Sequence, residues 1–323
     1  MKQIFIVVPV RNEADNLLTL YEQLNNKVFN VMPQYDWAIL FVDDGSTDNS
    51  WEIIDNLSLT NRKVFGLCLS RNFGKEMALT AGIEALKECD AVVCMDADLQ
   101  HPPEIVPQFV RKWEQGSEVV IGIRKECEDY SLFKKNGSRL FYSIMAKYSE
   151  LNMPQNSTDF RLIDKKVVSN VCRFTERTRI FRGLIGWMGY EKSFVEFVAP
   201  KRNGGKSTYS FKKLLDLAIN SFTSFSIFPL RLTGVLGIFI IAISGFLLLY
   251  MLLTDFIMDY AYSPLAYVVV FDTLIVGVIL VVLGVIAIYI GNIHTEVVQR
   301  PLYLIKAKID ATKQLNATVT LPN

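Results

Sequence analysis

AVVCMDADLQHPP, residues 91–103, joins a short apolar run to a pair of carboxylates. The run Ala91–Met95 is rich in β-branched residues, a pattern typical of a strand buried on both faces. Asp96 and Asp98 follow it, separated by one residue. Because ligands of open parallel sheets bind just beyond the carboxyl ends of the strands, these acids are expected at a ligand site. The stretch therefore predicts a buried strand that carries candidate catalytic groups.

Two carboxylates placed this way can converge on one hard cation. Mg²⁺ and Mn²⁺ prefer oxygen ligands and often share them with substrate phosphates. Gln100 adds an amide oxygen, and Pro102-Pro103 ends the loop and favours the start of a helix. The alternative is a turn with solvated acids, because Asp-x-Asp alone is a common pattern. We expect Mg²⁺ or Mn²⁺ at Asp96, Asp98 and Gln100.

Apolar runs of strand length alternate with amphipathic stretches along the first part of the chain. Besides Ala91–Met95, the expected strands are Ile4–Val10, Ala38–Val42, Val64–Leu69 and Val119–Ile123. The expected helices are Glu13–Leu24, Ser50–Leu57, Lys75–Lys87 and Glu104–Gln115. This alternation predicts a doubly wound, Rossmann-like α/β sheet with right-handed crossovers.

Polar residues also follow the first two expected strands, as PVRNE at 9–13 and DDGSTD at 43–48. Ser46 or Thr47 can cap the helix that follows. Asp43 ends a buried strand, where a carboxylate can accept an N–H from a flat base. No Gly-x-Gly-x-x-Gly follows the first strand and no Gly-x-x-x-x-Gly-Lys-Ser/Thr occurs anywhere, so dinucleotide oxidoreductases and P-loop enzymes are not favoured.

Composition restricts the class of function further. A net charge of +1 over 323 residues gives no global field that would attract nucleic acid. Five scattered cysteines without a Cys-x-x-Cys pair indicate reduced thiols in a cytosolic compartment. The run Ile4–Val10 is too short for a signal-peptide core. His101 and His294 have no partner at ligand spacing, so we expect no zinc site and no histidine at the ligand edge of the sheet.

The last third of the chain predicts a membrane attachment. Leu232–Leu253 and Thr273–Ile293 carry no charged residue and are long enough to cross a bilayer. Lysine and arginine flank both stretches and are absent between them, which predicts a helical hairpin with both flanks in the cytoplasm. Apolar residues at helical spacing in Phe211–Phe225 favour helices in the membrane interface. Asp272 is expected near the outer headgroups.

The expected parts are a catalytic domain at 1–210, amphipathic juxtamembrane helices at 211–230, two transmembrane helices within 231–294 (about 232–253 and 271–293) and a cytoplasmic C-terminal tail at 295–323.

Four motifs in register carry a family resemblance: VVPVRNE, VDDGSTD, RNFGKEMALTAG and DADLQHPP. They resemble the family 2 glycosyltransferases with a GT-A fold, and within them the polyisoprenyl-phosphate glycosyltransferases. That group holds dolichol-phosphate mannose synthases and bactoprenol glucosyltransferases of the GtrB type. The resemblance runs from Met1 to about Tyr303. It implies an inverting, multi-pass enzyme of the inner membrane, forming a homo-oligomer, that moves a hexose from a nucleotide sugar (UDP-sugar favoured, glucose expected) to polyprenyl phosphate at the cytoplasmic leaflet.

The resemblance also implies roles for single residues. The acceptor phosphate is expected at Arg124, which follows the fifth strand, and at Arg139 and Ser143, which share a helix face. Asp159 lies in a segment near the sugar, and whether it acts as base, sugar ligand or orienting group stays open. The expected catalytic set is Asp96, Asp98, Asp159 and Arg139. The expected donor-binding set is Pro9, Asn12, Glu13, Asp43, Asp96, Arg202 and Lys206.

Arg202 and Lys206 belong to a glycine-hinged basic loop, which we expect to close as a lid over the leaving diphosphate. The alternative for this loop is a linker drawn to the anionic lipid surface.

Two other functions were weighed. A processive polysaccharide synthase needs a transmembrane tunnel and carries Gln-x-x-Arg-Trp, which this chain lacks. A non-catalytic nucleotide-binding scaffold would have lost an acid from the Asp-x-Asp pair, and both acids are present. One departure from the family is Ala287–Gly291, AIYIG, where relatives often carry Gly-Glu-Tyr-Ile-Gly. It affects expected subunit or lipid contacts rather than the reaction.

Overall fold

The computed structural model describes residues 1–125, 157–176, 179–200, 246, 249–250 and 263–309. These residues belong to two compact units. One contains a β-sheet with its covering helices and includes the chain from Arg300 onward; the other contains the long helix α10 (Pro264–Val298). Each unit is described separately below.

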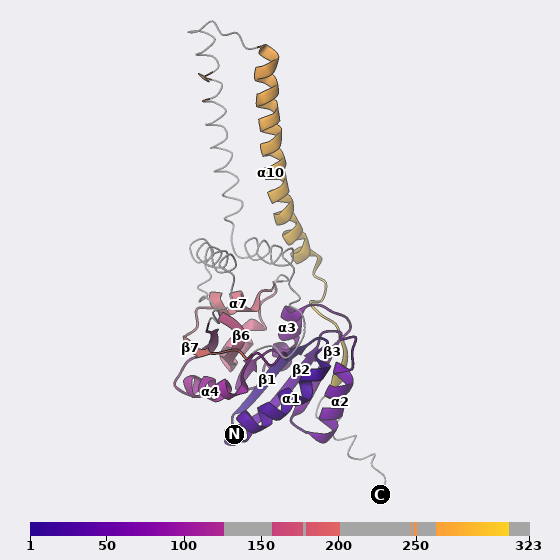
Figure 1. The fold of residues 1–323 in the computed structure, drawn as a ribbon, viewed down its shortest axis with the longest axis vertical. Coiled ribbons are helices and arrows are strands. Elements are labelled where there is room, and N and C mark those ends of the chain that lie inside the picture. Colours follow the sequence, from indigo (N-terminus) through magenta and orange to yellow (C-terminus); the bar gives the residue numbers. More distant parts are fainter. Residues whose placement is uncertain (126–156, 177–178, 201–245, 247–248, 251–262, 310–323) are drawn as a thin grey trace. The chain divides into compact units, whose positions relative to one another are not determined.

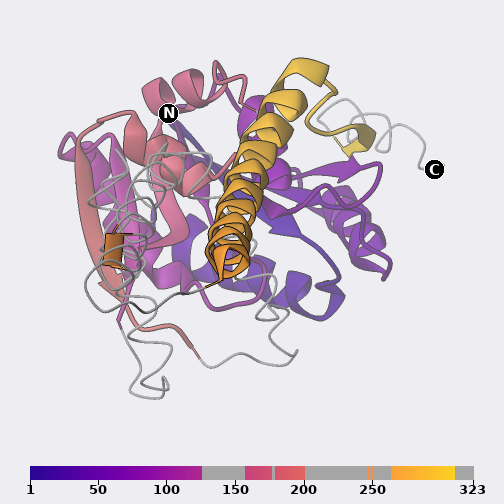
Figure 2. The same cartoon turned by 90° about the horizontal axis from the view of Figure 1, so that it is seen from above.

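The sheet is mixed, with the strand order β7-β5-β6-β4-β1-β2-β3-β8 (Figures 1 and 2). The strands are β1 Gln3–Val10, β2 Asp36–Asp43, β3 Val64–Leu69, β4 Ala91–Cys94, β5 Val119–Arg124, β6 Ser157–Asp164, β7 Lys192–Phe197 and β8 Ile305–Ile309. Strands β1 to β4 are mutually parallel where they pair, as are β5 and β7. Strand β6 runs antiparallel between β4 and β5, and β8 runs antiparallel to β3.

All five expected strands are confirmed, and the α/β class with them. The expectation of a simple doubly wound sheet was incomplete, because β6, β7 and β8 were not predicted. Strand β6 contains Thr158, Asp159 and Arg161, which hide its apolar alternation, and β8 has the sequence IKAKI. The sheet edge formed by β8 falls within residues expected to form only a tail.

Two apolar cores cover the two faces of the sheet. The residues of β1 alternate between them: Ile4, Ile6 and Val8 enter one core, and Phe5 and Val7 enter the other. The first core is covered by α1 (Ala14–Leu24), the π-helix η1 (Asn25–Phe29), α2 (Ser50–Thr60) and, after the 3-10 turn η2 (Pro103–Ile105), α4 (Val106–Glu114). The second is covered by α3 (Lys75–Ala85), α6 (Lys165–Val171) and α7 (Phe181–Trp187). The burial on both faces that was expected of Ala91–Met95 is also confirmed, because Val93 and Met95 enter the first core and Val92 and Cys94 enter the second.

Helix α3 lies unusually close to the sheet. A Cβ added at Gly82 would come within 2.6 Å of Val7 Cγ1, so only glycine fits there without a shift. This close packing fixes the height of α3 above β1. The position of its first residue, Lys75, relative to the strand ends follows from it.

Helix α10 is drawn as one continuous helix in Figure 1. Within the described part of the chain, it is the one helix long and apolar enough to cross a membrane, with the apolar stretch at Val281–Val298. The second expected span, about 271–293, lies inside α10. Residues 211–230 and nearly all of 232–253 lie outside the described residues, so the hairpin stays a prediction.

Candidate active site

The loop after β4 is held in a tight conformation. Asp96 donates its backbone N–H to His101 Nδ1 at 2.9 Å, and Asp98 Oδ1 accepts the backbone N–H of Gln100 at 3.1 Å. Leu99 has φ +61°, a conformation that costs energy for a residue with a side chain. The side chain of Asp96 keeps 27 % of its surface exposed. The two acids therefore stand on a rigid loop at the edge of the sheet, open to a ligand.

His101 lies inside this loop, which corrects the expectation that no histidine stands at the sheet edge. Its ring is buried and stacks on Phe160 with 4.9 Å between ring centroids. Burial lowers the pKa of His101, so the ring is neutral and its Nδ1 can accept the Asp96 N–H. His101 thus connects the backbone of the Asp96 loop to the ring of Phe160.

The antiparallel pairing of β4 with β6 brings a third acid to the site. Cys94 is the partner of Arg161 in the last pair of this register, and Asp96 and Asp159 each lie two residues beyond it. Two carboxylates brought to the same place repel each other. A cation is therefore required between these two carboxylates.

Lys75, the first residue of α3, supplies that cation. Its Nζ lies 2.6 Å from Asp96 Oδ1 and 2.7 Å from Asp159 Oδ2. Burial alone would lower the pKa of Lys75, but the two carboxylates outweigh it and raise the pKa above its ordinary value. Its side chain keeps 38 % of its surface exposed. Lys75 was not among the predicted site residues, although it lies in the motif RNFGKEMALTAG.

Asp159 is the most buried acid of this group, with 8 % of its side chain exposed. Its Oδ1 forms an ion pair with Arg182 Nε at 3.0 Å, and Arg161 Nη2 lies 3.9 Å away. Burial alone would raise the pKa of Asp159, but Lys75, Arg182 and Arg161 outweigh it and hold the pKa well below its ordinary value. Asp159 is thus a permanently ionised group. We call Lys75, Asp96, Asp159 and Arg182 the charge cluster.

Arg124 joins the β4 loop from the end of β5. Its Nη1 donates to Gln100 Oε1 at 3.2 Å, so this arginine and the Asp96–Gln100 loop share one edge of the sheet. Four other predicted residues, Arg139, Ser143, Arg202 and Lys206, lie outside the described residues. Their roles stay predictions.

The loops after β1 and β2 hold each other mainly by neutral hydrogen bonds, together with one from the Ala14 N–H to Asp48 Oδ2 at 3.2 Å. Asn12, with φ +55°, accepts the backbone N–H of Thr47 at Oδ1 over 2.8 Å and donates its own N–H to Ser46 Oγ at 3.0 Å. Glu13 donates its N–H to Ser50 Oγ at 3.0 Å. The expected capping of α2 by Ser46 or Thr47 is therefore wrong: the helix starts at Ser50, and these two side chains connect the loops instead.

Asp43 and Asp44 are both buried at the end of β2. Asp43 is 1 % exposed, accepts the Ser46 N–H at 3.1 Å and lies 3.4 Å from the Cys68 thiol. Asp44, which was not predicted, accepts the backbone N–H groups of Phe73 and Gly74 at 2.7 and 2.9 Å. Burial raises the pKa of Asp44. These acids organise the loops on either side of them, and contact of Asp43 with a base stays a prediction.

Comparison with known proteins identifies the family of this chain. Residues 5–172 match glycosyl transferase family 2. The chain belongs to this family. It is 36 % identical to the uncharacterized glycosyltransferase YkcC of Bacillus subtilis (strain 168), over 94 % of this chain and 93 % of that protein. It is 34 % identical to the bactoprenol glucosyl transferase of Shigella phage SfX, over 95 % of this chain and 99 % of that protein.

A third relative is the prophage bactoprenol glucosyl transferase homolog of Escherichia coli (strain K12), 32 % identical over 94 % of this chain and 98 % of that protein. The part that matches the family profile contains Lys75, Asp96, Asp98 and Asp159, whereas Arg182 lies beyond it. The matched region thus contains the sheet edge built around β4 with three of the four residues of the charge cluster.

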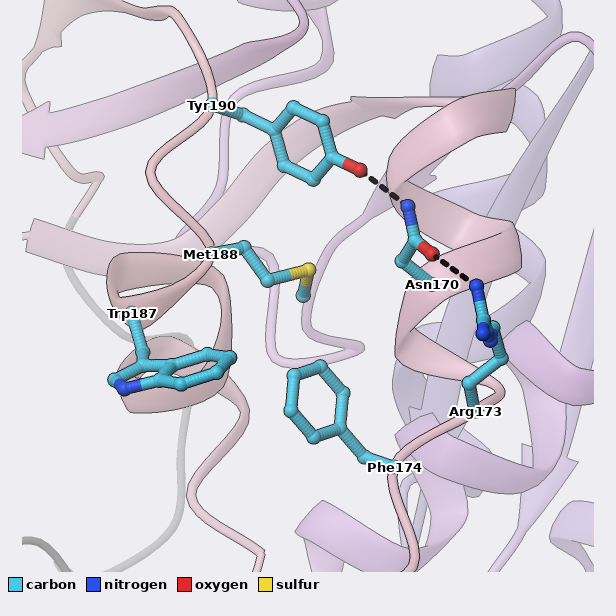
Figure 3. A pocket seen from close by; sticks show the side chains of 6 residues that line it. All are labelled: Asn170, Arg173, Phe174, Trp187, Met188 and Tyr190. Carbon is cyan, nitrogen blue, oxygen red and sulfur yellow. Dashed lines mark hydrogen bonds between the residues drawn. The ribbon is translucent and has the colours of Figure 1, made fainter.

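A separate pocket of about 270 Å³ opens elsewhere in the same unit (Figure 3). In it the rings of Phe174 and Trp187 meet edge to face, 5.7 Å apart, and Asn170 joins Tyr190 to Arg173 by hydrogen bonds. The pocket shares no lining residue with the charge cluster. The pocket is therefore separate from the charge cluster.

Proposed function

We propose that this glycosyltransferase moves a hexose from a nucleoside diphosphate sugar to a polyprenyl phosphate. The observation that carries the proposal is the similarity to the bactoprenol glucosyl transferase of Shigella phage SfX over 95 % of the chain. That alignment extends well beyond the catalytic sheet, so it includes the part of the chain expected to meet the lipid. The finer proposals are UDP as nucleotide, glucose as sugar and the inner leaflet as location.

Asp96 and Asp98 fit a divalent cation. Asp98 uses one oxygen for the Gln100 N–H, and Asp96 uses one for Lys75, which leaves each carboxylate a second oxygen outside these contacts. A pair of carboxylates with few further protein ligands suits Mg²⁺ or Mn²⁺, which keep water molecules and bind substrate phosphates as well. Gln100 is the proposed third ligand, through the oxygen that faces Arg124. When bound, the ion would offset the negative charge of the leaving diphosphate.

Lys75 is proposed to act on the donor directly. Its ammonium is fixed between Asp96 and Asp159 but remains 38 % exposed, so it can donate to a diphosphate or sugar oxygen without moving. A donor group that is preorganised by the protein stabilises developing charge at little reorganisation cost.

Asp159 is proposed to orient cations. A carboxylate whose pKa is held far below its ordinary value is a weak proton acceptor, so general-base catalysis by Asp159 is not favoured. Its two oxygens instead fix Lys75 and Arg182 in place. Of the three roles left open by the sequence, the orienting role agrees best with this geometry.

The acceptor needs no strong base. A phosphate monoester has a second pKa near ~6, so at neutral pH the attacking oxygen is already largely ionised. The task of the protein is then to align that oxygen with the sugar carbon, and alignment of two substrates can supply a large part of the rate enhancement. Arg124 is proposed to contribute from the described part of the site, with Arg139 and Ser143 beside it.

Membrane attachment through α10 and the predicted span 232–253 would keep the enzyme at the lipid surface. We propose a multi-pass protein of the inner membrane, with the sheet and both termini in the cytoplasm, assembled as a homo-oligomer. The cytoplasmic side is the side that nucleoside diphosphate sugars reach.

The test is transfer by membranes that contain the full-length protein. Membranes are incubated with a panel of labelled UDP-, GDP- and ADP-hexoses and either polyprenyl phosphate or the neutral polyprenol, and lipids are extracted. We expect label in the lipid only with the phosphate, and most from UDP-glucose. Membranes with Asp98→Ala serve as the matched control. Equal transfer to the neutral alcohol would disprove the lipid-phosphate acceptor, and a polymer of repeated sugars would instead identify a processive synthase.

A further inference from the structure

One face of α3 holds the segment that carries Arg182. Glu76 and Glu84 are eight residues apart in α3 and therefore lie on one side of the helix, two turns from each other. Glu76 Oε2 accepts the backbone N–H of Phe181 at 2.9 Å, and Glu84 Oε1 accepts Arg179 Nη1 at 3.2 Å. The start of α7 is thus attached to α3 at two points.

The attachment of Glu84 to Arg179 is stronger than that of Glu76 to the Phe181 N–H. The Arg179 side chain is 3 % exposed, and besides Glu84 it bonds to the backbone oxygens of Phe174 and Glu176. A buried guanidinium needs a negative partner, so Glu84 determines where Arg179 can lie. Arg182 follows three residues later and reaches Asp159 at 3.0 Å and the Ser157 carbonyl oxygen at 3.3 Å.

The second oxygen of Glu84 is held by the C-terminal part of the same unit. Tyr303 donates its hydroxyl to Glu84 Oε2 at 2.6 Å. Its neighbour Leu304 accepts the Ser70 N–H at 2.8 Å, and β8 then pairs with β3. Burial, followed by the contact with Glu84, raises the pKa of Tyr303, so its hydroxyl keeps the proton that it donates. Tyr303 lies in the short connection between the end of α10 and β8.

We propose that Glu84 and Tyr303 are positioning residues for sugar transfer. Tyr303 fixes the Glu84 carboxylate, Glu84 fixes Arg179, and Arg179 sets the start of α7 so that Arg182 meets Asp159. Through Tyr303, the connection that follows α10 helps to position Arg182 in the charge cluster. The connection itself contributes no residue to the cluster. The catalytic consequence rests on the proposed function, whereas the structural consequence does not.

The first measurement is hydrogen exchange, followed by mass spectrometry, of the full-length protein in detergent. Tyr303→Phe removes one hydroxyl, and Glu84→Gln removes the charge that faces Arg179. Tyr21→Phe is the matched control, because its hydroxyl bonds to Asn61 at 2.8 Å between α1 and α2, outside this chain of contacts. We expect amides at the start of α7, that of Phe181 included, to exchange about three- to tenfold faster in both test variants than in the control. Unchanged exchange there would overturn the proposal, even if the wild type transferred no sugar at all.

The second measurement is transfer kinetics. We expect Tyr303→Phe to lower kcat about three- to tenfold, less than the loss of a direct hydrogen bond to a charged group, because Tyr303 acts on Arg182 only through Glu84 and Arg179; the KM for the nucleotide sugar should be nearly unchanged. Tyr21→Phe should match the wild type. In an Arg182→Lys background, Tyr303→Phe should cause little further loss, because both changes act on one contact. An equal fold-loss in both backgrounds would show that Tyr303 does not act through Arg182.

Discussion

The two halves of the site are built from different interactions. At the end of β4 and the start of β6, the charge cluster joins side chains from distant parts of the chain; Lys75 and Asp159 are 84 residues apart. At the ends of β1 and β2, Asn12, Ser46 and Thr47 join neighbouring loops through neutral hydrogen bonds, several of them to backbone N–H groups. The first half depends on ion pairs between side chains, whereas in the second half carboxylates and neutral groups both bond to backbone N–H groups and thereby set the shape of the loops.

This difference predicts different sensitivity to substitution. Removing one partner of a fully buried ion pair costs about 3–5 kcal/mol, and solvent reduces this cost at Lys75, whose side chain is 38 % exposed. A neutral hydrogen bond contributes about 0.5–1.5 kcal/mol. Changes in the charge cluster should therefore abolish or strongly reduce catalysis, whereas changes in the β1 and β2 loops should shift donor binding by modest factors.

The largest effect is expected for Asp98→Ala. It removes a proposed metal ligand that is half-buried on an exposed loop, so transfer should fall by about 10³-fold or more, while the unfolding temperature changes little. Transfer to polyprenyl phosphate and thermal unfolding in detergent are measured together. EDTA should silence the wild type, and added Mn²⁺ or Mg²⁺ should restore it. Full activity of the variant, still dependent on a divalent ion, would place the ion elsewhere.

Two substitutions at Lys75 separate the effect of charge from the effect of side-chain geometry in the charge cluster. Lys75→Gln keeps much of the side-chain length but leaves Asp96 and Asp159 facing each other without a cation, and transfer should fall by about 10²-fold. Lys75→Arg restores the charge with different geometry and should recover part of the rate. Steady-state kinetics with the purified enzyme measure both variants. A rise in donor KM alone, with kcat unchanged, would show that Lys75 binds the donor without acting in the transition state.

Arg139 tests the acceptor side. A charge-assisted contact to phosphate contributes on the order of 1.5–3 kcal/mol, so Arg139→Ala should reduce acceptor efficiency about ten- to hundredfold and leave donor affinity nearly unchanged. Arg139→Lys should recover only part of the loss, because an ammonium cannot form a two-pronged contact. Transfer to a short polyprenyl phosphate is compared with donor affinity from calorimetry. Equal losses for both substrates would refute the acceptor role.

Position along the chain was enough to predict which side chains share the edge of the sheet. Asp96, Asp98 and Arg124 could be selected because they follow buried strands, and parallel strands bring such residues to one edge. The central strands were predictable because β1 and β4 are continuous apolar runs. These features depend on local sequence, which is visible without the fold.

The partners of those residues were not predictable. His101 and Lys75 reach the site through a loop conformation and a helix height that local patterns do not encode. Arg182 meets Asp159 only because β6 runs antiparallel beside β4 and α7 is held against α3. The motif RNFGKEMALTAG did contain a signal, since a lysine at the start of a helix near the ligand edge can meet anions or carboxylates.

The smallest effect is expected at Asn12, where shape and hydrogen bonding can be separated. Asn12 has φ +55°, so Asn12→Gly keeps the backbone conformation at little cost and removes the two side-chain bonds to Thr47. Asn12→Ala removes the same bonds but, unlike glycine, keeps a Cβ in the left-handed region without the local hydrogen bonding by which asparagine tolerates it. The glycine variant should raise the donor KM about three- to fivefold, at a cost in folding stability of about 1 kcal/mol, and the alanine variant should lose roughly 1–2 kcal/mol more. Donor titration and thermal unfolding measure the two quantities separately. A loss of kcat in Asn12→Gly comparable to that of Lys75→Gln would contradict the division of the site, because it would mean that the β1 loop contacts the reacting groups.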